Sequence, residues 1–274
     1  MGKVLLVDIT RCNGCYSCQL SCKDEHVGND WMPYAKPQPN TGHFWYKITE
    51  TVQGTVPKVR VHYMHEMCQH CDDAPCMKAC KAGAFYKRED GTVILDPAKC
   101  RGTRSCIDAC PYGAIYFNVD LNIAQKCTRC AHLIDNEGWT EPRCVQSCPT
   151  DALKYVDEEE VKDLAADFEQ LHPEYGTKPR VYYKGLLNKY FVAGEVYDSV
   201  ADECLEGATV SLIDEKGATV ATLKTDVFGD FWFERQIPGK YSVKIEMDGY
   251  AAKVIDGIDA TEKDVNIGSI DLKA

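Results

Sequence analysis

The fold of the first half of this chain is decided by the stretch Cys12-Asn13-Gly14-Cys15-Tyr16-Ser17-Cys18-Gln19-Leu20-Ser21-Cys22. It reads C-x2-C-x2-C-x3-C and follows an apolar segment, Lys3–Asp8, for which we predict a strand. Three thiolates two residues apart, in a loop that contains Gly14, can reach three irons of one cubane cluster. The fourth thiolate begins a helix that points away, and it usually serves a second cluster. The stretch therefore predicts an iron–sulfur protein.

Three further cysteine runs follow the first. The second has the spacing C-x2-C-x4-C-x3-C, the third lacks one cysteine, at Thr103, and the fourth has a widened gap before a closing C-x3-C-P. The repetition predicts two ferredoxin-like modules, one nested inside the other. Spacing leaves two pairings open: sequential, which joins the first run with the second, and nested, which joins the first with the fourth. The runs are Cys68, Cys71, Cys76 and Cys80; Cys100, Cys106 and Cys110; and Cys127, Cys130, Cys144 and Cys148.

Composition narrows the class of protein. Of the 16 cysteines, only Cys204 lies beyond Cys148, which is unlike the disulfide framework of a small secreted chain. We find no signal-peptide pattern and no run of roughly 18 apolar residues, so we expect a soluble, cytoplasmic protein without a membrane anchor. The net charge of −11 argues against nucleic acid as a partner, because no basic stripe could neutralise phosphates. It favours a soluble partner protein.

Other chemistries fit the sequence less well. Zinc sites also begin with C-x2-C, but structural zinc needs two such pairs per ion, and the tight triplets do not supply them. We interpret His62, His65 and His70, which crowd the second run, as residues beside the ligands or on the surface rather than as ligands. The sequence has no dinucleotide fingerprint, P-loop or hydrolase triad, so we do not expect the chain to be an enzyme by itself.

Thr103 stands where the template requires a thiolate. Because a hydroxyl is a poor iron ligand, we expect a [3Fe-4S] centre held by three cysteines, besides three [4Fe-4S] clusters. The alternative is a fourth [4Fe-4S] cluster whose open iron takes solvent or another side chain. Four clusters in one domain predict a relay for single electrons.

The remainder of the chain is organised around this domain. We expect an insertion, 28–66, that either covers the clusters or docks a partner, and an amphipathic helix at about 157–171 with Asp157 and Glu160 in a capping box. The predicted domains are 1–188, ferredoxin-like, and 189–274, an all-β sandwich or barrel of about seven strands, so the fold class is α+β. The expected strands are 43–49, 57–63, 92–95, 191–197, 209–213, 218–225, 231–234, 241–247, 252–255 and 265–272.

The third and fourth runs, Cys100-x5-Cys106-x3-Cys110-Pro111 and Cys127-x2-Cys130-x13-Cys144-x3-Cys148-Pro149, resemble the four-cluster subunits of the DMSO reductase family of molybdopterin oxidoreductases. The resemblance covers about residues 1–155 and implies nested pairing. Its nitrate reductase branch also lacks the cysteine at the Thr103 slot and has a three-iron cluster there. The implied ligand sets are Cys12, Cys15, Cys18 and Cys148; Cys127, Cys130, Cys144 and Cys22; Cys68, Cys71, Cys76 and Cys110; and Cys80, Cys100 and Cys106.

A closer resemblance is to the pyrogallol–phloroglucinol transhydroxylase branch, carried by Gln125–Thr128, Ala131–Leu133, Gly176–Lys184 and the β-rich tail. It implies a heterodimer with a large bis-molybdopterin molybdenum subunit that acts on phenolic or polyphenolic substrates by hydroxylation, dehydroxylation or transhydroxylation. That branch has a more depleted third run, whereas this chain keeps Cys100 and Cys106, which favours a fourth centre and an external electron carrier. Two alternatives are a ferredoxin-type subunit of a formate dehydrogenase or hydrogenase, and an assembly scaffold with structural clusters.

Overall fold

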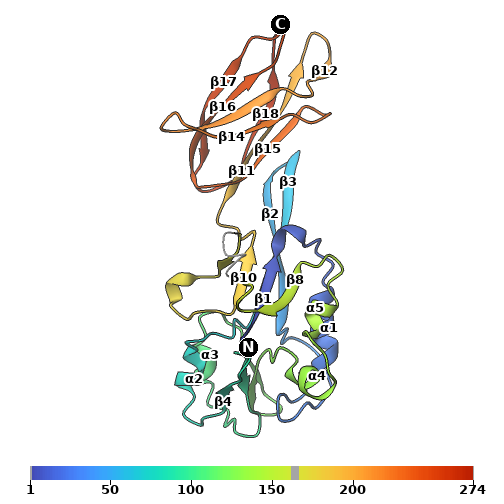
Figure 1. The fold of residues 1–274 in the computed structure, drawn as a ribbon, viewed down its shortest axis with the longest axis vertical. Coiled ribbons are helices and arrows are strands. Elements are labelled where there is room, and N and C mark those ends of the chain that lie inside the picture. The colour runs from blue at the N-terminus through green and yellow to red at the C-terminus, as the bar shows by residue number, and fades with distance from the viewer. Residues whose placement is uncertain (1, 162–166, 274) are drawn as a thin grey trace. The chain divides into compact units, whose positions relative to one another are not determined.

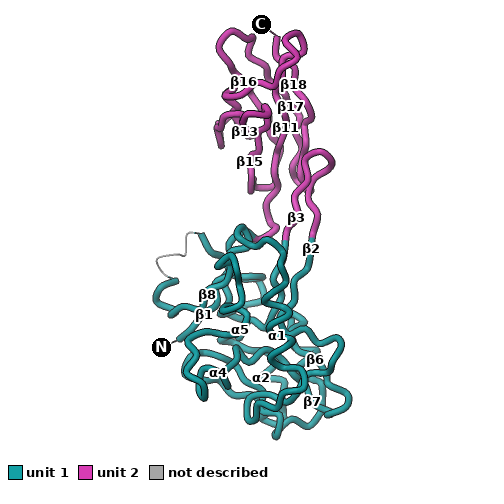
Figure 2. Tube along the Cα trace, turned by 90° about the vertical axis from the view of Figure 1, so that its right-hand side faces the viewer, with its two compact units in different colours: residues 1–50, 63–185 teal, residues 51–62, 186–274 magenta. Residues whose placement is uncertain are grey.

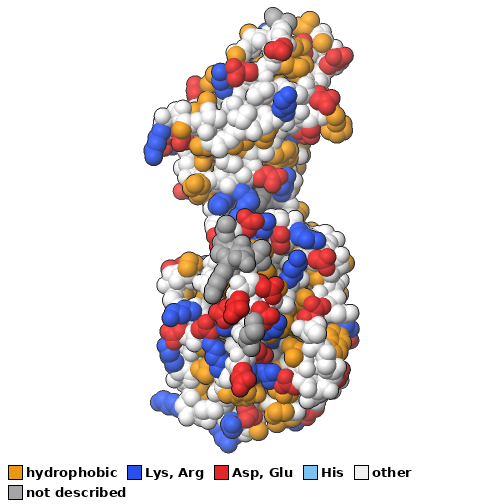
Figure 3. Space-filling view, viewed as in Figure 1, with side chains coloured by type: hydrophobic (Ala, Val, Ile, Leu, Met, Phe, Trp, Pro, Cys, Tyr) orange, Lys and Arg blue, Asp and Glu red, His pale blue; other side chains and the backbone are white. Residues whose placement is uncertain are grey.

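The computed structural model describes residues 2–161 and 167–273 and divides into two compact units. Unit 1 comprises Met1–Glu50 and Tyr63–Gly185, and unit 2 comprises Thr51–His62 and Leu186–Ala274 (Figures 1 and 2). Unit 1 contains every cysteine of the four runs. On the face shown in Figure 3, acidic and basic side chains are interspersed over both units. No helix within the described residues is long and apolar enough to span a bilayer.

Unit 1 is built from short elements that leave most of the cysteines in loops or at helix ends. Its helices and strands are β1 (Lys3–Asp8), η1 (Ile9–Arg11), α1 (Ser17–His26), β2 (Tyr46–Thr55), β3 (Lys58–Met67), α2 (Pro75–Ala79), β4 (Phe85–Lys87), β5 (Val93–Leu95), α3 (Ser105–Asp108), β6 (Tyr116–Asn118), β7 (Ile123–Gln125), α4 (Ala131–Asn136), α5 (Arg143–Gln146), β8 (Leu153–Asp157), β9 (Glu169–Gln170), η2 (Pro173–Tyr175) and β10 (Val181–Lys184). The tip of the β2–β3 hairpin belongs to unit 2.

The sheet of unit 1 has the strand order β8-β1-β10-β9. β1 is a continuous apolar run, and Val4 and Val7 are fully buried, as expected of a strand that is covered on both faces. It pairs antiparallel with β8, with Val7 opposite Leu153, and parallel with β10. Since the first cysteine run follows β1 and the fourth precedes β8, this pairing places both runs at the same end of the sheet.

The middle of unit 1 repeats this arrangement on a smaller scale. Helix α2 contacts α3, just as α1 contacts α5. Two antiparallel hairpins, β4–β5 and β6–β7, accompany the inner helix pair. Buried apolar side chains of the hairpins pack against the cysteines in one cluster, which includes Phe85, Val93 and Ala124. In sequence, the segment from α2 to β7 therefore lies between α1 and α5, so that one pair of helices is nested inside the other.

The expected helix at 157–171 is wrong at both ends. Asp157 is the last residue of β8 and pairs with Lys3, while Glu169 pairs with Tyr183 through β9. Backbone pairing with the sheet thus overrides the local amphipathic pattern. One half of the expected capping box is present, because the backbone N–H of Asp157 donates to Glu160 Oε1 (3.0 Å). The N–H of Glu160 donates instead to the backbone carbonyl of Asp157, and the carboxylate of Asp157 pairs with Lys3. Residues 162–166 of the expected helix lie outside the described residues.

Unit 2 consists of two four-stranded sheets. One has the order β12-β11-β15, with β18 pairing parallel to β11, and the other has the order β14-β13-β16-β17. Turn residues such as Gly217, Gly229 and Gly249 separate these strands at the expected places. A two-residue strand, β12, adds to the seven expected. The bounds are β11 (Tyr190–Asp198), β12 (Glu203–Cys204), β13 (Thr209–Asp214), β14 (Thr219–Lys224), β15 (Asp230–Gln236), β16 (Gly239–Glu246), β17 (Lys253–Ala260) and β18 (Val265–Asp271).

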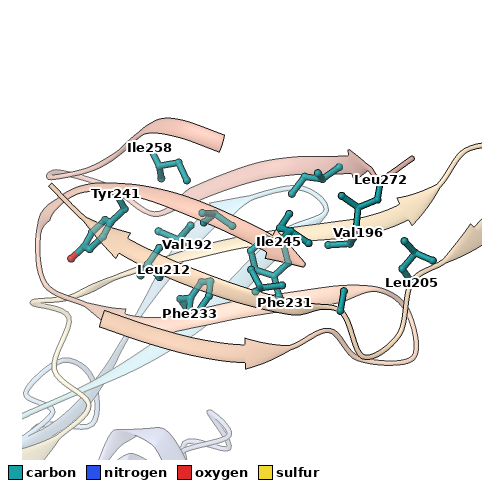
Figure 4. Packing of buried hydrophobic residues seen from close by; sticks show 14 of the residues in the cluster. Val192, Val196, Leu205, Leu212, Phe231, Phe233, Tyr241, Ile245, Ile258 and Leu272 are labelled. Atoms are coloured by element: carbon teal, nitrogen blue, oxygen red, sulfur yellow. The ribbon is translucent and has the colours of Figure 1, made fainter. Parts of the chain in front are cut away.

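Both sheets of unit 2 contribute to one apolar core (Figure 4). Along β16 every second side chain is buried, at Tyr241, Val243 and Ile245, which is the period of a strand with one covered face. Across the core lie Phe231 and Phe233, whose ring centroids are 5.8 Å apart. These contacts lie within unit 2.

The hairpin tip is fastened to β15 within unit 2. Lys58 forms an ion pair with Asp230, and the guanidinium of Arg60 lies 2.6 Å from Glu234 Oε1. Arg60 also lies over the ring of Trp232, 4.8 Å from its centroid. Residues 51–62 of the expected insertion are therefore part of the β-rich unit.

We expect Phe231→Ala to destabilise unit 2 by about 3–5 kcal/mol, because the substitution leaves a cavity in a closed core. Phe231 is 2% exposed. The measurement is denaturant unfolding followed by tryptophan fluorescence. Phe228→Ala is the matched control, since Phe228 is 69% exposed and should change stability by less than about 0.5 kcal/mol. Equal losses in both variants would contradict the packing described here.

Candidate iron–sulfur centres

All 16 cysteines are described and all are free thiols. The structure brings those of the first and fourth runs together around the contact between α1 and α5. The pKa of the Cys18 thiol is raised to about 12, mainly by burial, and the nearby thiols of Cys12, Cys148 and Cys15 raise it further. Cys15 is exposed, whereas Cys12 and Cys148 are half-buried. This group matches the first ligand set that the resemblance implies.

A second group of thiols includes Cys22, which lies one turn after Cys18 on α1. Burial and the neighbouring Cys127 and Cys130 raise the pKa of Cys22 well above its ordinary value. The pKa of Cys144 is raised in the same way, by burial and then by Cys130, Cys22 and Cys127. A cavity is lined by all four of these cysteines together with Leu5, Tyr46, Met67 and other buried residues. Cys22, Cys130 and Cys144 are buried, and Cys127 is half-buried.

The inner runs form the remaining two groups. The pKa of Cys76 is raised to about 12, by burial first and then by Cys68, Cys110 and Cys71. In the last group, burial followed by Cys100 and Cys80 raises the pKa of Cys106 to about 11. Both groups lie around the contact of α2 with α3.

Neighbouring cysteines connect these groups in succession. Cys18 and Cys22, four residues apart on α1, belong to the first and second groups, and residues at this spacing lie about 5–6 Å apart between Cβ atoms. Cys127 of the second group lies near Cys68 of the third, which after burial contributes most to the raised pKa of Cys127. Cys76 and Cys80 connect the third group to the fourth through α2. The first and last steps thus follow a single helix, and the middle step is made through space.

The chemistry of these thiols suits a cluster. In low-dielectric surroundings the neutral thiol is favoured, so a group of raised pKa loses its proton only when a cation replaces it. Backbone amides are aimed at several sulfurs: Arg129 N–H donates to Cys127 Sγ (3.3 Å) and Ala124 N–H to Cys100 Sγ (3.4 Å). Such donors stabilise the anionic sulfur of a bound cluster.

Within the described ranges, no three His, Cys, Asp or Glu side chains converge on a point that could hold a single metal ion. A cubane makes a different demand, because each thiolate binds a different iron at a separate corner. A cubane can therefore be bound by cysteines whose sulfurs lie around the cluster without meeting at one point.

Sequence reasoning missed the buried cations beside these groups. Lys126 is 2% exposed and its Nζ donates to the carbonyl of Cys127 (2.9 Å). Arg129 is 4% exposed, and its guanidinium donates to the carbonyls of Lys3 (3.0 Å) and Arg180 (2.8 Å). Buried cations offset the negative charge of thiolate-bound clusters. The sequence does contain a sign of these cations, because the basic residues Lys126 and Arg129 lie on either side of Cys127.

The insertion acts as a cover in unit 1. Trp45 and Tyr46 are both 2% exposed, and Trp45 packs on His26 with ring centroids 4.6 Å apart. Trp31 stacks on His132 of α4 at 4.4 Å. The backbone N–H of Tyr46 donates to the sulfur of Cys22. These contacts fit the covering role better than the docking role.

Thr103 is exposed and lies in the loop between Cys100 and α3. Its hydroxyl is 3.4 Å from that of Ser105. The loop turns at Gly102, at a φ of 67°, where an added Cβ would lie 2.7 Å from the side chain of Asn122. The close approach of Gly102 to Asn122 constrains the conformation of the loop at Thr103, the position where the template has a cysteine.

Gly14 is required by the first cysteine loop. Its φ is 70°, and a Cβ there would lie 2.2 Å from the ring of Tyr63. We therefore expect Gly14→Ala to lower the stability and cluster content of unit 1. Gly83→Ala is the control, because Gly83 has a φ of 61° with open space and should cost only about 1–2 kcal/mol. Thermal unfolding and iron analysis test this, and equal effects would show that Tyr63 is not the cause.

Comparison with known proteins gives the following matches. A family model described as a 4Fe-4S dicluster domain matches residues 59–158, and one described as a carboxypeptidase regulatory-like domain matches residues 192–273. The chain is 39% identical over 277 residues to the pyrogallol hydroxytransferase small subunit of Pelobacter acidigallici, which covers 98% of both chains. It is 34% identical over 199 residues to the B subunit of the anaerobic dimethyl sulfoxide reductase of Escherichia coli, covering 66% of this chain and 88% of that one. It is also 29% identical over 233 residues to the iron–sulfur subunit of the arsenate respiratory reductase of a Shewanella strain, covering 65% and 94%.

Proposed function

Since this chain belongs to the family of iron–sulfur electron-transfer subunits of molybdopterin oxidoreductases, we propose that it relays electrons between a bis-molybdopterin molybdenum subunit and an external carrier. The substrates proposed for the molybdenum subunit are phenolic or polyphenolic, in line with the name of the Pelobacter relative. The reaction class is hydroxylation, dehydroxylation or transhydroxylation. We expect the complex in the cytoplasm, and we assign the relay to residues 1–188 and the β-rich domain to 189–274.

One observation carries the proposal: the thiols of unit 1 gather in four groups, and each group has a cysteine next to a cysteine of the following one. Bound clusters would supply one-electron oxidation and reduction in each group. The chain itself provides the buried thiols, the N–H donors to sulfur and the covering aromatic side chains that exclude water. A succession of this kind has two ends, which suits a link between two redox partners.

We further propose the nested ligand sets. Three [4Fe-4S] clusters would be held by Cys12, Cys15, Cys18 and Cys148; by Cys22, Cys127, Cys130 and Cys144; and by Cys68, Cys71, Cys76 and Cys110. Cys80, Cys100 and Cys106 would hold a [3Fe-4S] cluster. The electrostatic neighbours of each buried thiol support this pairing. The β1–β8 pairing and the two helix contacts, α1 with α5 and α2 with α3, support two nested modules.

The test is made on the anaerobically purified complex with its catalytic subunit. A resorcinol-type substrate that is hydroxylated should reduce the clusters, and a pyrogallol-type substrate that is dehydroxylated should oxidise pre-reduced clusters. Freeze-quench EPR measures both changes. Turnover without a change in cluster oxidation state would assign the complex to transhydroxylation. If formate or hydrogen reduces the clusters and phenols do not, the chain is instead a ferredoxin-type subunit of a formate dehydrogenase or a hydrogenase.

A further inference from the structure

His70 is a buried imidazole that no ligand set uses. It is 1% exposed and lies between β3 and α2, at a φ of 46°. It lines the cavity that is enclosed by Cys22, Cys127, Cys130 and Cys144, and Cys68 of the third group lines the same cavity. The side chain is therefore at the step from the second group of thiols to the third.

The hydrogen bonding of the ring determines where its proton lies. The backbone N–H of Val93 donates to His70 Nδ1 at 3.1 Å. A backbone amide can only donate, so Nδ1 carries a lone pair and the proton of the neutral ring is on Nε2. Val93 is itself held in the β4–β5 hairpin opposite Lys87, which fixes the direction of the donor.

The Nε2–H group has no hydrogen-bond partner among the described residues. Leaving a buried donor unpaired is costly, because its hydrogen bond to water is lost without replacement, so a partner is expected at this position. Leu5 and Met67 on the cavity wall are poor acceptors, and Arg129 can only donate. The other lining residues are Pro142, His26, Tyr46 and five cysteines, and the hydroxyl of Tyr46 already bonds to His65 Nδ1 (2.7 Å), so sulfur is the most abundant acceptor at the cavity.

With Nδ1 occupied by the Val93 amide, the ring offers one proton, at Nε2, in a fixed direction.

We propose that His70 Nε2–H donates a hydrogen bond to a sulfur of the cluster bound by Cys22, Cys127, Cys130 and Cys144, and so raises the reduction potential of that cluster. The inference rests on the proposed electron relay and identifies a residue that regulates it. A donor to sulfur stabilises the reduced, more negative state over the oxidised one. His70 is a positioning residue, since it acts through the cluster and changes which cluster of the relay is reduced first.

The experiment uses the complete complex and EPR-monitored redox titration. His70→Asn keeps a short polar group that can face Val93 N–H and tolerates the positive φ, but it cannot reach the cavity. His70→Gln restores a donor near the position of Nε2. His43→Asn is the matched control, because His43 has a φ of 47°, lies in unit 1 and does not line the cavity.

We expect His70→Asn to shift the potential of one cluster to more negative values, His70→Gln to recover part of the shift, and His43→Asn to leave all potentials unchanged. Proton ENDOR in H2O and D2O should lose one exchangeable coupling in His70→Asn. Unchanged potentials and couplings, with all cluster signals intact, would overturn the proposal for His70. Absence of the cluster signals in the unmodified complex would instead overturn the proposed relay.

Discussion

Replacing Cys148 with alanine should remove the cluster of the first cysteine run and leave the three-iron signal untouched. Cys148 follows α5, whereas its partners Cys12, Cys15 and Cys18 surround the start of α1. Iron analysis should show a loss of one to about four irons: the cubane is either lost whole, or it loses its fourth corner and adds a second three-iron signal to the existing one. The oxidised-state EPR signal of the [3Fe-4S] centre should remain.

The same variant separates the two pairings. Under sequential pairing, Cys148 would complete the cluster of the third run, so its removal would abolish the three-iron signal and spare the first cluster. Cys204→Ala is the control, since Cys204 is exposed in β12 of unit 2 and belongs to no group. Loss of the three-iron signal in Cys148→Ala alone would therefore refute the nested sets.

The four cysteine runs could be predicted from the cysteine spacing, because ligand spacing is a local property of the chain, whereas their nested pairing was implied only by the resemblance. The strands of unit 2 were also predictable, since turn residues such as Gly217 and Gly229 separate runs with alternating burial. The expected strands at 43–49 and 57–63 were too short. The observed strands are Tyr46–Thr55 and Lys58–Met67, and Thr55 lies at the tip, where Lys58 forms an ion pair with Asp230 in unit 2.

What could not be predicted depends on contacts between distant segments. The helix expected at 157–171 was wrong because β1 and β10 recruit its two ends into the sheet. The sequence placed His70 beside the ligands or on the surface, and only the structure shows that Val93, 23 residues away, fixes its proton. Arg129 was missed for the same reason, since the carbonyls that it binds belong to Lys3 and Arg180.

The second large effect is expected at the missing ligand. Thr103→Cys should convert the [3Fe-4S] centre into a fourth [4Fe-4S] cluster, because it restores a thiolate at the template position. Thr103 is exposed and its hydroxyl makes a weak contact with that of Ser105, so the substitution should not disturb packing. The oxidised-state three-iron EPR signal should disappear, and the reduced complex should gain the signal of another cubane.

The potential of this centre should fall as well, since cluster type and net charge are among the factors that set potentials over the range of roughly −700 to +450 mV. Thr103→Ser is the control for a change of side chain without a thiolate, and it should keep the three-iron signal. If the unmodified complex already contains four cubanes, an unidentified ligand closes the fourth corner, and Thr103→Cys should then leave the iron content unchanged. Iron for only three clusters would mean that Cys80, Cys100 and Cys106 hold none, which would remove one end of the succession and with it the argument for net electron transfer.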